Sequence, residues 1–302
     1  MEIIKFTLEK IPSLPKKSAL CLGYFDGVHL AHQALISEAK KTGLPVAVLT
    51  FSDSDNVLIN RRKNVLTTFV DKAEILEKFG VDYLLVVPFD QALMSLTPDK
   101  FISKLLNNFN IGYAICGFDY TFGAKAAGRA TDLVNSEIAN FTTIVVEKMA
   151  TTDEQIISTT LIKEKIVSGA IGSANSLLGY HYAITGKVVK GHGNGRKLGF
   201  PTANIEPSAN YVIPKNGVYA ATLEVNGKTY LGMSSVGTHP TIDEVDHRVI
   251  EIHLFDFNED LYGKDVKISF LRFERDERKF TSVDELIKQM QSDEKTIRTD
   301  FS

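Results

Sequence analysis

The 302-residue sequence contains little cysteine, no long apolar run and no excess of positive charge. Its two cysteines, Cys21 and Cys116, each lie in an apolar run typical of a buried strand. Reduced thiols are therefore expected rather than a disulfide framework. No apolar run approaches the ~18 residues that span a bilayer, and residues 1–5 lack the pattern of a signal peptide. The net charge of −3 gives no electrostatic footprint for nucleic acid. These absences predict a cytoplasmic protein without nucleic-acid or membrane partners.

The first half of the sequence alternates short apolar runs with amphipathic segments. Near-continuous apolar strands separated by helices indicate a parallel sheet covered on both faces. Two further helices are expected before Gly179. A chain of this length exceeds one comfortable hydrophobic core, so we predict two domains, 1–180 and 181–302. Strands are expected at 19–23, 46–50, 83–87, 111–116 and 143–146, and helices at 29–41, 67–79, from Thr97 onward, 160–167 and 171–178.

The second half shows strands with turn signals and no long helix between them. Asn226-Gly227 favours a hairpin, because both residues tolerate positive φ. Several short strands in succession predict a small antiparallel β-barrel, and Ser282 caps a closing helix. The barrel strands are expected at 182–189, 218–225, 229–236, 249–255 and 266–273.

A first candidate site follows the strand at 19–23. Gly23 and Gly27 would let the backbone approach a ligand closely, and the next helix offers free N–H groups to a phosphate. His29 and His32 are three residues apart and could donate hydrogen bonds to the phosphates of ATP. From these residues alone, a solvated histidine pair at a helix start is the more common interpretation.

A second candidate site is the glycine-rich stretch from Gly191 to Asn204. Glycines free backbone N–H groups to form an anion-binding concavity, although barrel corners also use glycine. Thr202 and Asn204 offer oxygens suited to Mg²⁺. The Walker A ending is absent. The predicted phosphate-binding residues of this loop are Gly191, Gly193, Gly195, Arg196 and Lys197.

A lone carboxylate, Glu251, lies on the strand predicted at 249–255. Glu251, His253 and Phe255 share one face of this strand, and three aliphatic residues share the other. The carboxylate could act as a general base toward a hydroxyl. A solvated outward face is the alternative.

Spaced motifs along nearly the whole chain resemble those of bacterial bifunctional riboflavin kinase/FAD synthetases. Residues 23–33 are similar to the family's G-x-F-D-G-x-H-x-G-H-Q, residues 117–123 to G-x-[DN]-F-x-F-G, and residues 157–163 to I-S-S-T-x-I-R. Residues 186–204 are similar to the flavokinase signature that ends in G-F-P-T-A-N, and residues 251–257, 261–263 and 275–280 to later flavokinase segments.

The resemblance implies a Rossmann-like nucleotidylyltransferase domain joined to a six-stranded flavokinase barrel. It implies phosphorylation of riboflavin to FMN and adenylylation of FMN to FAD, with ATP as co-substrate, Mg²⁺ as cofactor and pyrophosphate released. Glu251 would deprotonate the ribityl 5′-hydroxyl, and Thr202 and Asn204 would hold Mg²⁺ and the ATP phosphates. The other implied residues are His29 and His32 for adenylyl transfer; Gly23, Phe25, Asp26, Gly27, Ser158, Thr159 and Lys163 for ATP and phosphate; and Asp119, Phe122 and Arg275 for the flavin.

Three residues depart from the family's pattern. Ala31 stands in place of Gly, Thr159 in place of Ser, and Lys163 in place of Arg. The lysine keeps the positive charge but lacks the planar guanidinium that binds phosphate bidentately. These departures leave open a monofunctional riboflavin kinase. A non-catalytic flavin sensor is a third possibility, but it would need neither Glu251 nor a metal ligand.

Overall fold

The computed structural model describes residues 1–52, 64–191, 195, 198–238 and 248–301. The chain forms two compact units, Met1–Thr159 and Thr160–Ser302. Helices α6 (Thr159–Val167) and α7 (Ile171–Leu178) thus lie almost wholly in the second unit, whereas the functional boundary expected from the sequence falls after residue 180. That functional boundary stays a prediction. No helix in the described part of the chain is both long and apolar enough to cross a membrane.

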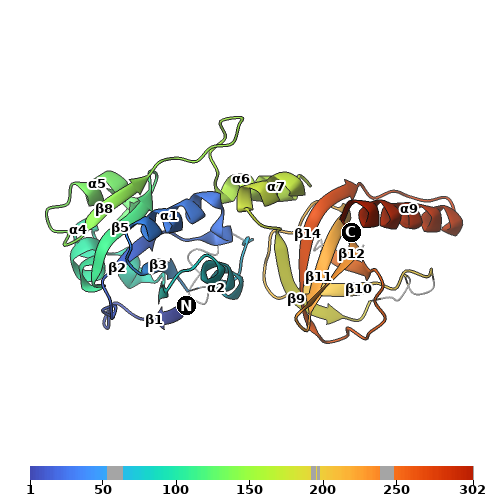
Figure 1. Cartoon of the computed structure of the whole chain (residues 1–302), viewed down its shortest axis with the longest axis horizontal. Helices are drawn as coiled ribbons and strands as arrows, with labels where there is room; N and C mark the ends of the chain where they lie inside the picture. Colours follow the sequence, from blue (N-terminus) through green and yellow to red (C-terminus); the bar gives the residue numbers. More distant parts are fainter. Residues whose placement is uncertain (53–63, 192–194, 196–197, 239–247, 302) are drawn as a thin grey trace. The chain divides into compact units, whose positions relative to one another are not determined.

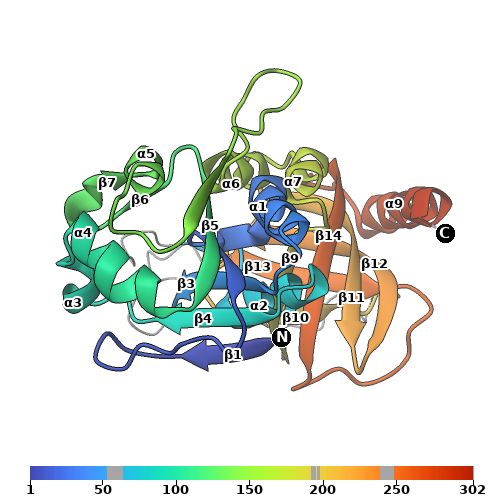
Figure 2. The same ribbon diagram turned by 60° about the vertical axis from the view of Figure 1, so that its left-hand side comes forward.

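The first unit is built on a six-stranded parallel sheet (Figure 1). The five strands expected from the sequence are confirmed within one or two residues at their ends. An additional edge strand, β1, pairs in parallel with β4 (Figure 2). In sheet order the strands are β1 (Glu2–Lys5), β4 (Tyr83–Val87), β3 (Val46–Phe51), β2 (Ser18–Leu22), β5 (Ile111–Gly117) and β8 (Thr142–Val146).

Helices cover both faces of this sheet, as the apolar strands predict. One core cluster packs alternate strand residues such as Ala19 and Cys21 against α1 (Leu30–Lys41) and α2 (Phe69–Lys78). The other packs residues such as Leu20 and Cys116 against shorter helices. The two cysteines are free thiols on opposite sides of the sheet. The shorter helices are α3 (Gln91–Met94), α4 (Pro98–Lys100), the π-helix η2 (Phe101–Leu105), the 3-10 helix η3 (Leu106–Asn108) and α5 (Ala130–Val134).

The second unit contains a closed six-stranded antiparallel barrel, which confirms the predicted barrel. The predicted hairpin is present, with Asn226 at φ 52° and Gly227 at φ 73°. The strands in barrel order are β10 (Ala203–Pro207), β13 (Arg248–Leu254), β12 (Lys228–Thr238), β11 (Gly217–Val225), β14 (Asp265–Arg275) and β9 (Ala183–Val189).

The closing helix α9 (Val283–Phe301) packs on the outside of the barrel (Figure 1). Ile297 is fully buried against Val218, Ala220 and Met233. Ion pairs join the helix to the barrel, including Arg275 with Asp293 at 2.7 Å.

Candidate active sites

The order of the first sheet predicts where a ligand should bind. From central strand β2 the chain proceeds to β3 and β4 on one side, then returns to β5 on the other side of β2. In open α/β sheets, ligands bind at the carboxyl ends of the strands where the order reverses in this way. The loop 23–29 follows β2, and the motif at 117–123 begins at the last residue of β5. Two of the motifs singled out in the sequence therefore lie at the expected edge of the sheet.

The loop 23–29 has an unusual backbone that neighbouring residues hold in place. Phe25 (φ 57°) and Val28 (φ 34°) adopt positive φ although neither is glycine, and such conformations cost roughly 1–3 kcal/mol each. The Asp26 carboxylate accepts hydrogen bonds from the backbone N–H groups of Leu66 (2.9 Å) and Thr67 (3.1 Å). The Gly27 N–H donates to Thr67 Oγ1 at 2.9 Å. Residues just before α2 thus fix the loop.

Phe25 and Asp26 lie inside the fold, at 0% and 3% exposure. The Phe25 ring packs against the His32 ring, with centroids 4.7 Å apart. In the structure both side chains support the loop. Their predicted contact with ATP stays a prediction.

His29 and His32 lie face to face at the start of α1. His29 is the N-cap of the helix, and the two rings stack with centroids 3.7 Å apart. The buried Nδ1 atoms of both rings have no hydrogen-bond partner among the described residues. Polar atoms that are buried without a partner are rare in folded proteins and point to a missing ligand or water.

Both imidazoles are neutral near pH 7. Burial lowers the pKa of His29 to about 4, against an opposing effect of the Asp26 carboxylate. Burial also lowers the pKa of His32 well below 6.5, and the electrostatic coupling to His29 and to the Lys72 ammonium lowers it further. Each neutral ring still carries one N–H group and can donate one hydrogen bond.

The other predicted residues of this site differ in their placement. The Thr159 hydroxyl donates to the backbone carbonyl of Asp26 at 3.3 Å, so the third motif meets the first. Asp119 is exposed beyond β5. Phe122 is only 4% exposed and packs on Phe101 in the core. Lys163 lies on α6 in the second unit, and its part in the first site stays a prediction.

The second site brings together the three residues proposed for phosphoryl transfer. Asn204 on β10 lies directly opposite Glu251 on β13, so the two side chains share one face of the barrel wall. The Thr202 hydroxyl donates to Glu251 Oε2 at 3.3 Å. The Ser234 hydroxyl donates to the Glu251 carbonyl at 2.8 Å, which fixes the backbone from which the carboxylate projects. Residues 49 apart in the sequence thus form one cluster.

Two of the described glycines of the phosphate loop, Gly191 and Gly195, are closely packed. A Cβ atom at Gly191 would come within 2.2 Å of Asn204 Nδ2, and one at Gly195 within 2.3 Å of the Phe200 carbonyl oxygen. Neither position has space for a side chain without a shift of the loop. Gly193, Arg196 and Lys197, which were also predicted to bind phosphate, lie outside the described residues.

His253 shares the face of Glu251, as the strand pattern predicts, but its ring contacts the turn at Phe200 and Pro201. Its Nδ1 lies 2.8 Å from the Pro201 carbonyl oxygen, and its ring meets that of Phe200 edge to face. This contact holds the turn that carries Thr202.

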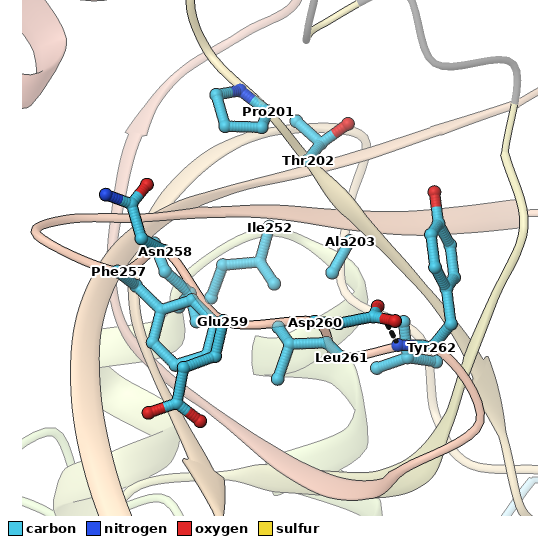
Figure 3. Close-up of a pocket in the computed structure, with 12 residues that line it drawn as sticks. Pro201, Thr202, Ala203, Ile252, Phe257, Asn258, Glu259, Asp260, Leu261 and Tyr262 are labelled. Atoms are coloured by element: carbon cyan, nitrogen blue, oxygen red, sulfur yellow. Dashed lines mark hydrogen bonds between the residues drawn. The ribbon is translucent and has the colours of Figure 1, made fainter.

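A cavity of about 490 Å³ opens beside Thr202 (Figure 3). Its volume falls in the usual range for small-molecule pockets. The floor is apolar, and the loop after β13 adds polar groups at the rim, among them Asp260, which accepts from the Tyr262 N–H at 3.0 Å. Leu261 and Tyr262 belong to the motif at 261–263, but no pocket was expected there from the sequence. The lining residues are Val188, Pro201, Thr202, Ala203, Ile252, Leu254, Phe257, Asn258, Glu259, Asp260, Leu261 and Tyr262.

Arg275, predicted to lie near the flavin, is engaged within the second unit. Its Nε and one terminal nitrogen donate to Asp293 Oδ2 at 2.9 and 2.7 Å, and the other terminal nitrogen donates to the Asp276 carbonyl at 3.1 Å. These bonds hold α9 to the end of β14. A contact between Arg275 and the flavin stays a prediction.

Comparisons with known proteins match both halves of the chain. The family model described as FAD synthetase matches residues 11–160, and the model described as riboflavin kinase matches residues 178–301. A bifunctional riboflavin kinase/FMN adenylyltransferase of Listeria monocytogenes is 41% identical over 290 residues, covering 94% of this chain and 92% of the relative. Its counterpart in Bacillus subtilis is 37% identical over 295 residues, covering 95% and 93%.

A solved structure is also similar over the full length. It is a Streptococcus pneumoniae protein described as a macrolide-efflux protein, with a TM-score of 0.90, 32% identity and coverage of 99% of both chains. The likeness shows that both units of this chain occur together in another structure.

Proposed function

Because the chain belongs to the family of bifunctional riboflavin kinase/FMN adenylyltransferases, we propose that its two sites divide FAD synthesis between them. The chain is a riboflavin kinase and an FMN adenylyltransferase. The proposal assigns phosphorylation to the cluster of Glu251, Thr202 and Asn204, and adenylylation to the pair His29 and His32.

In the kinase step, Glu251 takes the proton of the ribityl 5′-hydroxyl of riboflavin. The hydroxyl oxygen then bonds to the γ-phosphorus of ATP, the bond from that phosphorus to the β,γ-bridging oxygen breaks, and ADP leaves. Phosphoryl transfer depends mainly on positioning and on charge stabilisation. The 3.3 Å contact between Thr202 and Glu251 is the observation that carries this assignment, because it places the proposed base beside the proposed phosphate ligand.

Thr202 and Asn204 suit Mg²⁺, which prefers oxygen ligands and usually keeps several waters while it binds phosphates. Thr202 offers a hydroxyl oxygen and Asn204 an amide oxygen. Bound there, Mg²⁺ would neutralise phosphate charge.

The cavity beside Thr202 suits the adenosine part of this ATP. The apolar side chains Ile252 and Leu254 offer a surface for the base, and the rim carboxylates Glu259 and Asp260 can accept hydrogen bonds from ribose hydroxyls or an amino group. Since Thr202 lines the same cavity, a nucleotide seated in it would extend its phosphates toward Glu251.

In the adenylyl step, a phosphate oxygen of FMN bonds to the α-phosphorus of ATP. The bond from that phosphorus to the α,β-bridging oxygen breaks, and pyrophosphate leaves. The stacked imidazoles donate hydrogen bonds to the phosphates as negative charge moves onto the leaving group. The unpartnered, buried Nδ1 atoms of both rings support this role. We place the work of the chain in the cytoplasm, in keeping with its free buried thiols.

One time course tests the division of labour. Riboflavin, ATP and Mg²⁺ are supplied, and FMN and FAD are separated by chromatography. FMN should appear first and FAD later. FMN supplied with ATP should give FAD and pyrophosphate directly; its failure to do so would favour the monofunctional kinase that Ala31 and Lys163 suggest.

A further inference from the structure

Lys72 is a buried cation that the functions above do not use. It lies in the first turn of α2, and only 1% of the residue is exposed. Burying an ammonium group is costly unless it is paired and hydrogen-bonded, whereas an apolar side chain of the same length could pack at this position. A lysine retained here therefore calls for an explanation.

The ammonium of Lys72 contacts the loop that carries the histidine pair. Its Nζ donates to the Tyr24 carbonyl oxygen at 2.9 Å and lies 4.3 Å from the centroid of the Tyr24 ring. The Thr50 hydroxyl donates to the same carbonyl at 3.0 Å, and Nζ lies 3.4 Å from this hydroxyl. Two buried donors from α2 and β3 therefore meet on one carbonyl of the loop, directly before the strained residue Phe25.

The start of α2 is itself well fixed. Thr68 and Asp71 form a capping box, with the Thr68 side chain accepting from the Asp71 N–H and the Asp71 carboxylate accepting from the Thr68 N–H at 2.9 Å. Just before it, Thr67 binds the Gly27 N–H. The same helix start thus holds the loop at two points, Tyr24 and Gly27, on either side of Phe25.

We propose that Lys72 is a positioning residue of the adenylyltransferase site, whose buried ammonium holds the Tyr24 carbonyl and so keeps the loop 23–29 in the conformation that aims His29 and His32 at the phosphates of ATP. This proposal rests on the proposed role of the histidine pair. Lys72 also acts on the pair electrostatically, since its charge helps to lower the pKa of His32. The other charged or titratable groups acting on the pair, among the described residues, are Asp26 and the two rings themselves.

The test compares Lys72→Met with Lys78→Met, in which an exposed lysine of the same helix is changed. Misplacement of reacting groups by about 1 Å costs on the order of 100-fold in rate. We expect Lys72→Met to lower kcat for FMN to FAD by roughly that factor, with a much smaller change in the affinity for ATP. Riboflavin phosphorylation by the same preparation should be unchanged, and Lys78→Met should match the wild type in both steps.

A second readout separates positioning from a purely structural role. In an NMR titration of the imidazoles, His32 of folded Lys72→Met should take up its proton at higher pH than in the wild type, because one cation near the ring is gone. Signals are assigned with His29→Asn and His32→Asn. A loss of FAD formation without this shift and with weakened ATP binding would mean general loosening of the unit, and would overturn the proposal.

The outcomes also distinguish this inference from the proposed function. If His29→Asn abolishes FAD formation while Lys72→Met stays within threefold of the wild type, the role of Lys72 is refuted and that of the pair stands. If His29→Asn is also near normal, the function proposed for the pair fails. If Lys72→Met does not fold, Lys72→Gln is judged by the same criteria, and failure of both to fold would overturn positioning in favour of a requirement for folding.

Discussion

Replacing Glu251 with glutamine tests the proposed base of the kinase step. The two side chains have nearly the same shape, so Glu251→Gln removes the ability to take a proton while it preserves volume. The backbone at this position is paired with Asn204 on one side and Ser235 on the other, and its carbonyl accepts from Ser234. The substituted side chain should therefore project from an unmoved strand, and any loss of rate should be chemical.

The size of the expected loss follows from the role of a general base. Such a group contributes on the order of 10²–10⁴-fold, or about 2.7–5.4 kcal/mol of activation free energy. We expect kcat for riboflavin to FMN to fall by that range, with the riboflavin Kd changed by less than about threefold, because Glu251→Gln keeps a polar group of equal size beside Thr202.

The assay follows FMN by chromatography at saturating ATP and Mg²⁺. Glu224→Gln, at an exposed position on β11, is the matched control, and conversion of FMN to FAD by the same preparation reports the integrity of the first unit. A Glu251→Gln enzyme that phosphorylates riboflavin within threefold of the wild-type rate would refute the assignment of Glu251 as base.

Three further predictions concern His29 and the phosphate loop. His29→Asn should reduce FAD formation by on the order of 10²-fold and leave FMN formation unchanged; equal losses in the two assays would contradict separate sites. The folded pKa of His29, about 4, lies below its ordinary 6.5, so its contribution to stability is complete above pH 6.5 and is lost as the pH falls toward 4, by up to about 3 kcal/mol. The drop in melting temperature between pH 7 and pH 4.5 should be smaller in His29→Asn than in the wild type. An equal drop in both proteins would argue against a lowered pKa of His29. Gly191→Ala should impair the kinase at least about tenfold, because its Cβ would meet Asn204 Nδ2 at 2.2 Å; Gly172→Ala, where a Cβ meets nothing within 4 Å, is the control.

The sequence predicted those helices and strands whose pattern of apolar and polar residues reflects which of their faces are buried. The central strands are apolar throughout because both of their faces are covered, and the strand at Glu251 alternates because only one of its faces packs in the barrel interior. The edge strand β1 was missed, since Glu2, Ile3 and Lys5 are exposed and show no such periodicity. The helix expected from Thr97 begins there, with the Thr97 side chain as cap, but continues as the π-helix η2, which no local pattern predicted.

The candidate sites were predictable to the extent that their residues are contiguous in the sequence. The loop 23–29 and the turn at Thr202 carry their own signals, whereas the meeting of Thr202 with Glu251 depends on strand pairing across the barrel. Lys72 was missed because a lysine in an amphipathic helix is normally expected to face water. Its burial comes from packing against Tyr24 and Thr50, which are distant in the sequence, and that is a tertiary effect.

The barrel is a closed sheet, whereas the sheet of the first unit is open and has two border strands. The barrel closes on itself, so each of its six strands has a hydrogen-bonded neighbour on both sides, whereas β1 and β8 border the first sheet with one side unpaired within it. Unpaired strand borders are templates on which another chain can add. If the enzyme is heated or concentrated, aggregation should therefore start in its first unit, and a charged residue in place of the exposed Ile3 would be the first substitution to try for keeping the protein in solution.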